Sequence, residues 1–248
     1  MGDRLAGKRA IVTGGASGFG EGIVRRFAEE GARVLIADVN EDAARALAAQ
    51  TGAEACACDV SRAESVAALK GAAERAFGGV DIVVNNAGIG HRPTPLDEVD
   101  EAMFDRLIAV NAKSVYLTAR AFAPAMKAAR AGAILNVAST GGVSPRPNLT
   151  WYNASKGWMI TATRAMAVEL APFGVRVNAL NPVAGETPLL ATFMGGDTPE
   201  VRAKFLASIP LGRFSTPQDI ASAACFLCSD EASMITGVAL EVDGGRTI

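Results

Sequence analysis

Two side chains with acid/base chemistry stand one helical turn apart in the segment 151–157. Tyr152 precedes Lys156 by four positions and follows Ser139 by thirteen. In a helix, side chains four residues apart share one face, so the ammonium would lie beside the phenol. A neighbouring cation lowers the pKa of a phenol from about 10 by about 1 to 3 units, toward the range useful for proton transfer. The spacing predicts a lysine-assisted tyrosine acid/base, although Tyr-x-x-x-Lys also arises by chance in long helices.

A glycine cluster lies between the first predicted strand and the first predicted helix. The segment Thr13–Gly20 has the sequence TGGASGFG, and Asp38 follows at the end of the second predicted strand. Glycines here let backbone amides and a helix N-terminus approach a pyrophosphate, and a later acidic residue accepts hydrogen bonds from ribose hydroxyls. The spacing Gly-x-x-x-Gly-x-Gly departs from Gly-x-Gly-x-x-Gly, but its context predicts a dinucleotide site.

Apolar, β-rich runs alternate with helical patterns along the chain. These near-continuous apolar runs are typical of parallel strands that are buried on both faces. They cover Arg9–Thr13, Arg33–Ala37, Glu54–Cys58, Ile82–Asn85, Ala133–Val137, Arg176–Leu180 and Ala239–Val242. We therefore predict an α/β fold, a single-domain doubly wound parallel sheet (Rossmann fold) of about seven strands over residues 1–248. Within it, the long connection 183–215 has one short helical pattern near 200–207 and is predicted to be a substrate-binding loop.

Composition narrows the class of ligand. The chain has 248 residues, a net charge of −2 and interspersed charges, which argues against nucleic acids and anionic membrane surfaces as partners. No apolar run approaches the roughly 20 residues of a membrane span, and the first residues lack a signal-peptide pattern, so we expect a cytoplasmic protein. Cys225 and Cys228 have Cys-x-x-Cys spacing, but they fall in an apolar periodic run and the only histidine is His91, so the zinc signal is weak. We expect no metal, and we expect Cys225 and Cys228 to be small buried side chains.

Taken together, several motifs resemble the short-chain dehydrogenase/reductase family over essentially the whole chain. They are Thr13-Gly14-x-x-x-Gly18-x-Gly20, Asn85-Asn86-Ala87-Gly88, Asn111, Ser139, Tyr152-x-x-x-Lys156 and Asp243-Gly244-Gly245. The resemblance implies a seven-stranded Rossmann sheet, a nicotinamide cofactor and oxidoreductase activity on alcohols and carbonyls. It also implies that Tyr152 is the acid/base, that Lys156 lowers its pKa and holds the nicotinamide ribose, that Ser139 bonds the substrate oxygen and that Asn111 anchors a water relay.

The resemblance further implies which residues bind the cofactor. They are Gly14, Ser17, Gly18, Phe19, Gly20, Asp38, Val39, Asp59, Val60, Asn86, Ala87, Gly88, Tyr152, Lys156, Pro182, Val183, Gly185 and Thr187. Val183 stands where the family usually has glycine, so the local backbone path is left open, and Phe19 replaces a smaller aliphatic residue. Asp38 predicts NAD rather than NADP, because a carboxylate bonds ribose hydroxyls and repels a 2′-phosphate.

The sequence defines the substrate less well. The candidates for the substrate mouth are His91, Arg146, Trp151, Phe193 and Met194. His91 also fits an exposed loop residue without a role, and Arg92 or Arg146 could pair with an anionic substrate. The apolar candidates favour a modest, partly apolar secondary alcohol or cyclic polyol.

Three functions fit these patterns. The first is an NAD-dependent dehydrogenase of secondary alcohols or polyols. The second is a 3-oxoacyl thioester reductase, which would prefer NADPH and need a basic rim for an acidic carrier protein. The candidates for such a rim are Arg92, Arg146, Arg202, Lys204 and Arg213. The third is a non-catalytic dinucleotide-binding regulator, which need not keep the residues of the acid/base set. The resemblance and the long apolar-rich helices predicted at 103–129 and 152–171 also predict a homotetramer that binds a small-molecule substrate. Natural substrate and physiological direction do not follow from the sequence.

Overall fold

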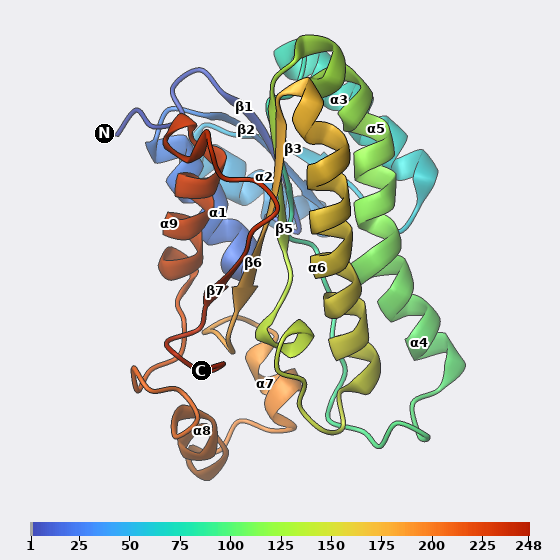
Figure 1. Ribbon diagram of the computed structural model, residues 1–248, viewed down its shortest axis with the longest axis vertical. Coiled ribbons are helices and arrows are strands. Elements are labelled where there is room, and N and C mark those ends of the chain that lie inside the picture. Colours follow the sequence, from blue (N-terminus) through green and yellow to red (C-terminus); the bar gives the residue numbers. More distant parts are fainter. Residues whose placement is uncertain (1) are drawn as a thin grey trace.

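Seven parallel strands form one sheet at the centre of a computed structural model that describes residues 2–248 (Figure 1). The strands are β1 (Arg9–Thr13), β2 (Arg33–Asp38), β3 (Glu54–Ala57), β4 (Ile82–Asn85), β5 (Gly132–Val137), β6 (Val175–Pro182) and β7 (Ala239–Val242). Their order is β3-β2-β1-β4-β5-β6-β7, and every neighbouring pair is parallel. The predicted doubly wound Rossmann sheet is confirmed. Its order reverses between β1 and β4, where folds of this type bind ligands beyond the carboxyl ends of the strands.

The central strands are buried on both faces. Ile11 and Val12 of β1 are inaccessible to solvent, and Val83 and Val84 of β4 are at most 1% exposed. This burial explains why the sequence shows continuous apolar runs rather than alternation. The predicted bounds agree for β1, β4 and β7 and differ by at most two residues elsewhere; β6 continues two residues past the predicted Leu180.

Helices cover both faces of the sheet. On one face lie α1 (Gly18–Glu29), α2 (Glu41–Thr51) and α9 (Pro217–Cys228), and on the other α3 (Ala63–Phe77), α5 (Ser114–Ala129) and α6 (Thr150–Leu170) (Figure 1). Phe27 of α1 and Met126 of α5 are almost completely buried in these two layers. Burying a side chain of this size contributes about 1.5–3 kcal/mol. The layers therefore hold α1 and α6 firmly against opposite faces of the sheet.

The helix predicted at 103–129 contains a π-helical turn. α4 (Glu101–Ile108) leads into this turn (Ala109–Lys113), and α5 follows. Single π turns are frequent at functional sites. The middle residue of this one is Asn111. The second long helix, α6, begins two residues before the predicted Tyr152, so Tyr152 and Lys156 lie in its first two turns.

The connection 183–215 contains two short helices at the carboxyl edge of the sheet. They are α7 (Leu190–Met194) and α8 (Pro199–Leu206), at the bottom of Figure 1. Only α8 was predicted, because five residues are too few to give a periodic pattern. The segment has its own apolar core, which includes Val183, Leu190 and Phe214. It is therefore a packed element rather than a loose loop.

The cysteines serve packing. All four are free, and Cys225 and Cys228 are buried in α9 as predicted. Across residues 2–248, no group of three or more His, Cys, Asp or Glu side chains could hold a metal ion. In the same part of the chain, no helix is both long and apolar enough to cross a membrane.

Candidate active site

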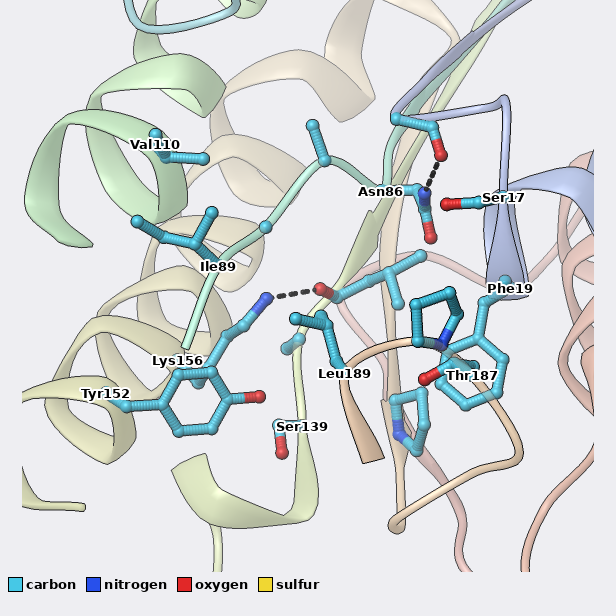
Figure 2. A pocket seen from close by; sticks show the side chains of 18 of the residues that line it. Ser17, Phe19, Asn86, Ile89, Val110, Ser139, Tyr152, Lys156, Thr187 and Leu189 are labelled. Carbon is cyan, nitrogen blue, oxygen red and sulfur yellow. Dashed lines mark hydrogen bonds between the residues drawn. The ribbon is translucent and has the colours of Figure 1, made fainter. Parts of the chain in front are cut away.

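A cavity of about 480 Å³ opens at the carboxyl ends of the central strands. Asp38 and Asp59 line what we call the aspartate end, beyond β2 and β3. Ser139, Tyr152 and Phe193 line the tyrosine end, beyond β5. Two strands, β1 and β4, separate β2 from β5, so the two ends are roughly 14 Å apart at a strand spacing of about 4.8 Å. Figure 2 shows the labelled side chains of both α1 and α6 facing this space.

The glycine turn after β1 leaves space next to the start of α1. Gly14 and Gly18 have φ angles of 59° and 56°, a region that favours glycine. A Cβ on Gly20 would lie 2.1 Å from the Gly14 carbonyl oxygen, so only glycine lets α1 begin this close to the turn. Ser17 makes no side-chain capping bond to α1. Its hydroxyl and the free N–H groups of the first turn can therefore bind an anionic group.

The carboxylate of Asp38 is held in place by the backbone. Its Oδ2 accepts a hydrogen bond from the Ala16 amide at 3.0 Å, and its Oδ1 accepts one from the Asn40 amide at 2.9 Å. The neighbouring Val39 is exposed and also lines the cavity. A carboxylate so anchored can bind two adjacent hydroxyl groups of a sugar.

Asp59 and Val60 line the same end, after β3. The hydroxyl and the amide of Ser61 donate to Asp59 Oδ1 at 2.6 and 3.0 Å. Hydrogen bonds from Ser61, helped by nearby arginines that include Arg106, lower the pKa of Asp59. Arg106 reaches the cavity from α4. The aspartate end is therefore polar, with an apolar neighbour in Val60.

Asn86 ties the end of β4 to the glycine turn. Its Nδ2 donates to the carbonyl oxygens of Thr13 and Gly14 at 3.0 and 2.9 Å. The Thr13 hydroxyl accepts in return from the amides of Asn86 and Ala87. This reciprocal set joins β1 to β4 where the strand order reverses.

The acid/base candidates meet on one wall of the tyrosine end. Tyr152 is 7% exposed and Lys156 is 4% exposed. Lys156 Nζ donates to the Val137 carbonyl at 2.9 Å and lies 6.0 Å from the centroid of the Tyr152 ring (Figure 2). Ser139 Oγ, just after β5, accepts from the Gly141 amide at 3.0 Å. The phenol, the hydroxyl and the ammonium thus face the same cavity.

The pKa of Tyr152 depends mainly on burial. Burial raises it, against smaller lowering effects of the Ser139 hydroxyl and the Arg146 charge. Burial also lowers the pKa of Lys156 to about 8. The net direction for Tyr152 is therefore upward, because the phenol is shielded from water and burial disfavours its charged form. The lowering by Lys156 that the family resemblance implies stays a prediction.

Asn111 lies behind this wall rather than on it. Its Oδ1 accepts from the Ile89 amide at 2.9 Å, and its Nδ2 donates to the Ile89 carbonyl at 2.9 Å and to Ser155 Oγ at 3.1 Å. A Cβ at Gly88 would lie 3.3 Å from Lys156 Nζ and 3.5 Å from Asn111 Oδ1. The amide and the ammonium therefore border the same small space at Gly88, which glycine keeps open.

The valine that replaces the usual glycine continues the strand. Val183 follows Pro182, donates its amide to the Val242 carbonyl at 3.3 Å and is 8% exposed. Its side chain belongs to the apolar core of the segment 183–215. The backbone path left open by the sequence is thus an extension of β6 toward β7.

Phe19 and Gly185 are complementary. A Cβ at Gly185 would lie 2.3 Å from the Phe19 ring, so the larger aromatic side chain depends on glycine there. Thr187 packs against Gly18, where a Cβ would come within 3.2 Å of the threonine Cβ. These contacts bring the segment 183–215 against the glycine turn.

Two of the five predicted substrate residues, Arg146 and Phe193, line the cavity. The Phe193 ring centroid is 4.7 Å from that of Tyr152, so an aromatic face closes the tyrosine end. The Arg146 guanidinium lies 4.8 Å from the centroid of Phe205 of α8. The exposed Arg92 does not line the cavity.

The other three, His91, Trp151 and Met194, do not line the cavity. His91 is 6% exposed, and its Nδ1 lies 2.7 Å from the Arg92 carbonyl oxygen, so the alternative of an exposed loop histidine is wrong. Trp151 packs edge-on against Phe104, and Met194 joins the core of the segment 183–215. These side chains support the cavity from outside.

Several residues that line the cavity were not predicted. They include Cys58, Ser61, Ile89, Arg106, Ala109, Val110, Thr140 and Pro188. Ile89 and Val110 directly flank the predicted Gly88 and Asn111, so adjacency was an available signal. No sequence signal pointed to Arg106, because only the tertiary fold brings α4 to the cavity.

Comparison with known proteins agrees with this geometry. The model of a family described as enoyl-(acyl carrier protein) reductase matches residues 14–247. The chain is similar to 4-formylbenzenesulfonate dehydrogenase of Comamonas testosteroni, with 52% identity over 245 residues, 96% of this chain and 97% of that protein. It is 42% identical to cis-4-hydroxycyclohexanecarboxylate dehydrogenase of Sinomonas cyclohexanicum, over 100% and 99% of the two chains.

A solved structure has the same fold throughout. The 3-ketoacyl-(acyl-carrier-protein) reductase of Brucella melitensis, complexed with NADH, superimposes with a TM-score of 0.94 at 53% identity and covers 98% of this chain and 100% of its own. With the family model and the dehydrogenases above, this likeness shows that the chain belongs to the short-chain dehydrogenase/reductase family.

Proposed function

We propose that the protein oxidises a partly apolar secondary alcohol or cyclic polyol with NAD, or reduces the corresponding ketone. As a member of this family it is an oxidoreductase that acts on CH–OH groups. The main support for this substrate class is the apolar face of Phe193, which lies beside Tyr152 at the tyrosine end. The alcohol named for the S. cyclohexanicum relative sits on an apolar ring, which supports a substrate of that size.

The aspartate end fits NAD. The glycine turn and the open start of α1 suit a pyrophosphate, and the anchored Asp38 suits the adenosine ribose. NAD, when bound, accepts the hydride from the substrate carbon or returns it. We assign to its binding, besides Asp38, Gly14, Ser17, Gly18, Phe19, Gly20, Val39, Asp59, Val60, Asn86, Ala87, Gly88, Tyr152, Lys156, Pro182, Val183, Gly185 and Thr187.

Residues at the tyrosine end transfer the proton. In oxidation, Tyr152 Oη takes the proton of the substrate hydroxyl, and in reduction it returns a proton to the forming alkoxide. Ser139 donates a second hydrogen bond to the same oxygen. Because burial raises the pKa of Tyr152, the phenolate needs positive charge nearby, and we assign this role to Lys156. Asn111, which borders the same space, would hold a water that links Lys156 to solvent.

A substrate panel tests the proposal. Purified enzyme with NAD is given cis-4-hydroxycyclohexanecarboxylate, cyclohexanol and D-threitol, and NADH formation is followed. We expect a ring alcohol to exceed threitol by at least tenfold in kcat/KM, about 1.4 kcal/mol of transition-state preference. If threitol is the best substrate, the apolar character assigned to this site is wrong.

Reduction of 3-oxoacyl thioesters is the second candidate. It is favoured by the similarity to the B. melitensis 3-ketoacyl-(acyl-carrier-protein) reductase. It requires a basic rim, and two of the five candidate rim residues, Arg202 and Arg213, are already paired with Asp197 and Asp219. Oxidation of NADH and NADPH with an acetoacetyl thioester decides between the two. Thioester turnover tenfold above every alcohol would reverse the ranking.

A non-catalytic regulator would bind NAD tightly and turn over none of these compounds. The complete set of Asn111, Ser139, Tyr152 and Lys156 argues against it, because binding alone does not require this set. Detectable NADH formation with any panel alcohol would exclude it.

We further propose a single-domain homotetramer that works in the cytoplasm, with the segment 183–215 as its substrate-binding loop. Exposed apolar side chains on α5 and α6, such as Tyr116, Trp158 and Val168, support assembly. Free cysteines are usual in reducing compartments. Light scattering tests assembly, and a monomer at micromolar concentration would contradict it.

A further inference from the structure

Arg146 lines the tyrosine end of the cavity without a protein partner for its charge. Its side chain is half-buried and lies over the Phe205 ring. Among residues 2–248, no ion pair and no side-chain hydrogen bond involves its guanidinium. Burial lowers the pKa of Arg146. The guanidinium is thus partly shielded from water, and no protein acceptor compensates for that shielding.

Other arginines show what a structural role looks like in this chain. Arg9 donates to both carboxylate oxygens of Asp81, at 2.8 and 2.6 Å. Arg176 has no carboxylate, but it donates to the carbonyls of Leu227, Ser229 and Ile235. Arg146 has neither kind of acceptor among residues 2–248; its guanidinium lies over the Phe205 ring, a contact that leaves its N–H donors free for a ligand.

The charges around the cavity leave the tyrosine end positive. The acidic residues that line the cavity, Asp38 and Asp59, belong to the aspartate end, roughly 14 Å away by strand spacing. Arg246, near the end of the chain, also lowers the pKa of Arg146 by its positive charge. No carboxylate from residues 2–248 lines the tyrosine end. An anion that entered there would meet uncompensated positive charge.

We infer that Arg146 determines specificity by binding a carboxylate or sulfonate group of the substrate, so that the substrate is a ring alcohol with an anionic acid group remote from the reacting carbon. That the substrate is a ring alcohol rests on the proposed function. A guanidinium matches such an oxyanion with two parallel hydrogen bonds, and that of Arg146 is supported by the Phe205 ring 4.8 Å away. Phe193, whose ring lies against that of Tyr152, provides the apolar surface for the substrate ring.

Binding without turnover tests the inference. NAD-saturated enzyme is titrated in a calorimeter with cyclohexanecarboxylate and with cyclohexanecarboxamide, its neutral counterpart, neither of which has a hydroxyl to oxidise. We expect the carboxylate to bind at least tenfold more tightly. Arg146→Met should abolish this preference while leaving the amide affinity unchanged, and Arg146→Lys should keep part of it.

Arg92→Met is the matched control, because it also removes one positive charge but lies outside the cavity. It should keep the full preference. The inference is overturned if the wild type shows no preference, if Arg146→Met retains it, or if Arg146→Met weakens both ligands equally. Thermal unfolding of each variant identifies a folding defect. If Arg146→Met does not fold, the reduced carboxylate preference of Arg146→Lys is the test.

The alcohol panel separates this inference from the proposed function. If Arg146 confers the carboxylate preference but no ring alcohol is oxidised, the proposed function fails and the anion site stands. If cyclohexanol and cis-4-hydroxycyclohexanecarboxylate are oxidised with equal kcat/KM, the proposed function stands and the inference fails. If the proposed function and the inference on Arg146 are both correct, Arg146→Met should raise KM for the hydroxy acid at least tenfold with little change in kcat.

Discussion

The two ends of the cavity satisfy their polar groups in different ways. At the aspartate end, both oxygens of Asp38 and the amide of Asn86 are bonded to the backbone. At the tyrosine end, the guanidinium of Arg146 has no acceptor among residues 2–248. The Asp38 carboxylate and the Asn86 amide are thus held by the backbone before a ligand binds, whereas the Arg146 guanidinium has no hydrogen-bond acceptor until one does.

This difference predicts how each end responds to the substitution of its residues. Groups anchored by the backbone discriminate between cofactors by shape and charge with little adjustment. Groups without partners interact mainly with the reacting molecule, so their removal should affect turnover or substrate affinity more than stability.

Tyr152→Phe should reduce kcat by about 100- to 10,000-fold, the usual contribution of a positioned acid/base group. The affinity for NAD should stay nearly unchanged, because the aspartate end is untouched. Steady-state rates and NAD titration measure the two quantities. Tyr116→Phe, which changes the chain's other tyrosine on the exposed face of α5, is the matched control and should keep full activity. Near-normal turnover of Tyr152→Phe would refute the assigned role.

Asn136→Ala should lower the free energy of unfolding by about 2 to 4 kcal/mol. Asn136 Oδ1 accepts from Asn85 Nδ2 at 2.8 Å, and its Nδ2 donates to Thr163 Oγ1 of α6 at 2.8 Å. Removing the amide leaves the buried Asn85 donor unpaired beneath the helix that carries Tyr152. Denaturant unfolding measures the loss, and the exposed Gln218→Ala provides a reference near zero. A loss below about 1 kcal/mol would show that this network contributes little.

Lys156 should give stability a defined pH dependence in the absence of NAD. Its folded pKa is about 8 against 10.5 in the unfolded chain, so above pH 8 the unfolded state binds more protons and stability rises with pH. The unfolding free energy of the wild type, relative to Lys156→Met, should increase by about 2 kcal/mol between pH 8 and pH 9.5. Urea unfolding of both proteins measures this. A constant difference would mean that burial does not shift the Lys156 pKa.

Asp38→Asn should lower the ratio of kcat/KM for NAD to that for NADP at least tenfold, about 1.4 kcal/mol. The substitution keeps the shape but removes the charge that repels a 2′-phosphate. The ratio is the informative quantity, since a general loss of structure lowers both rates together. Wild-type enzyme that used NADP as well as NAD would contradict the role of Asp38 directly.

The sequence predicted the aspartate end better than the tyrosine end for a physical reason. Strands such as β1 and β4 are continuous apolar runs, and the glycine turn and Asp38 occupy fixed positions at their ends. Local sequence therefore determines local geometry there. The structure adds the backbone bonds to Asp38, the complementarity of Phe19 and Gly185, and the contribution of Arg106 from a distant helix.

The tyrosine end depends on contacts that local sequence does not encode. Arg92 and Arg146 were equivalent as candidates, but only Arg146 is covered by Phe205 of α8 and lines the cavity. His91 is buried although loop position suggested exposure. The spacing of Tyr152 and Lys156 correctly implied a shared helix, yet the direction of the Tyr152 pKa depends on burial, which spacing does not reveal.

Deuterium transfer tests the central claim, hydride exchange between NAD and a ring alcohol, most directly. The enzyme is incubated with NAD and cis-4-hydroxycyclohexanecarboxylate that carries deuterium on the carbinol carbon, and the NADH formed is examined by mass spectrometry. We expect NADH that carries the deuterium, in an amount equal to that of the ketone. Ketone formed without deuterated NADH, or no ketone from any alcohol of the panel, would contradict it.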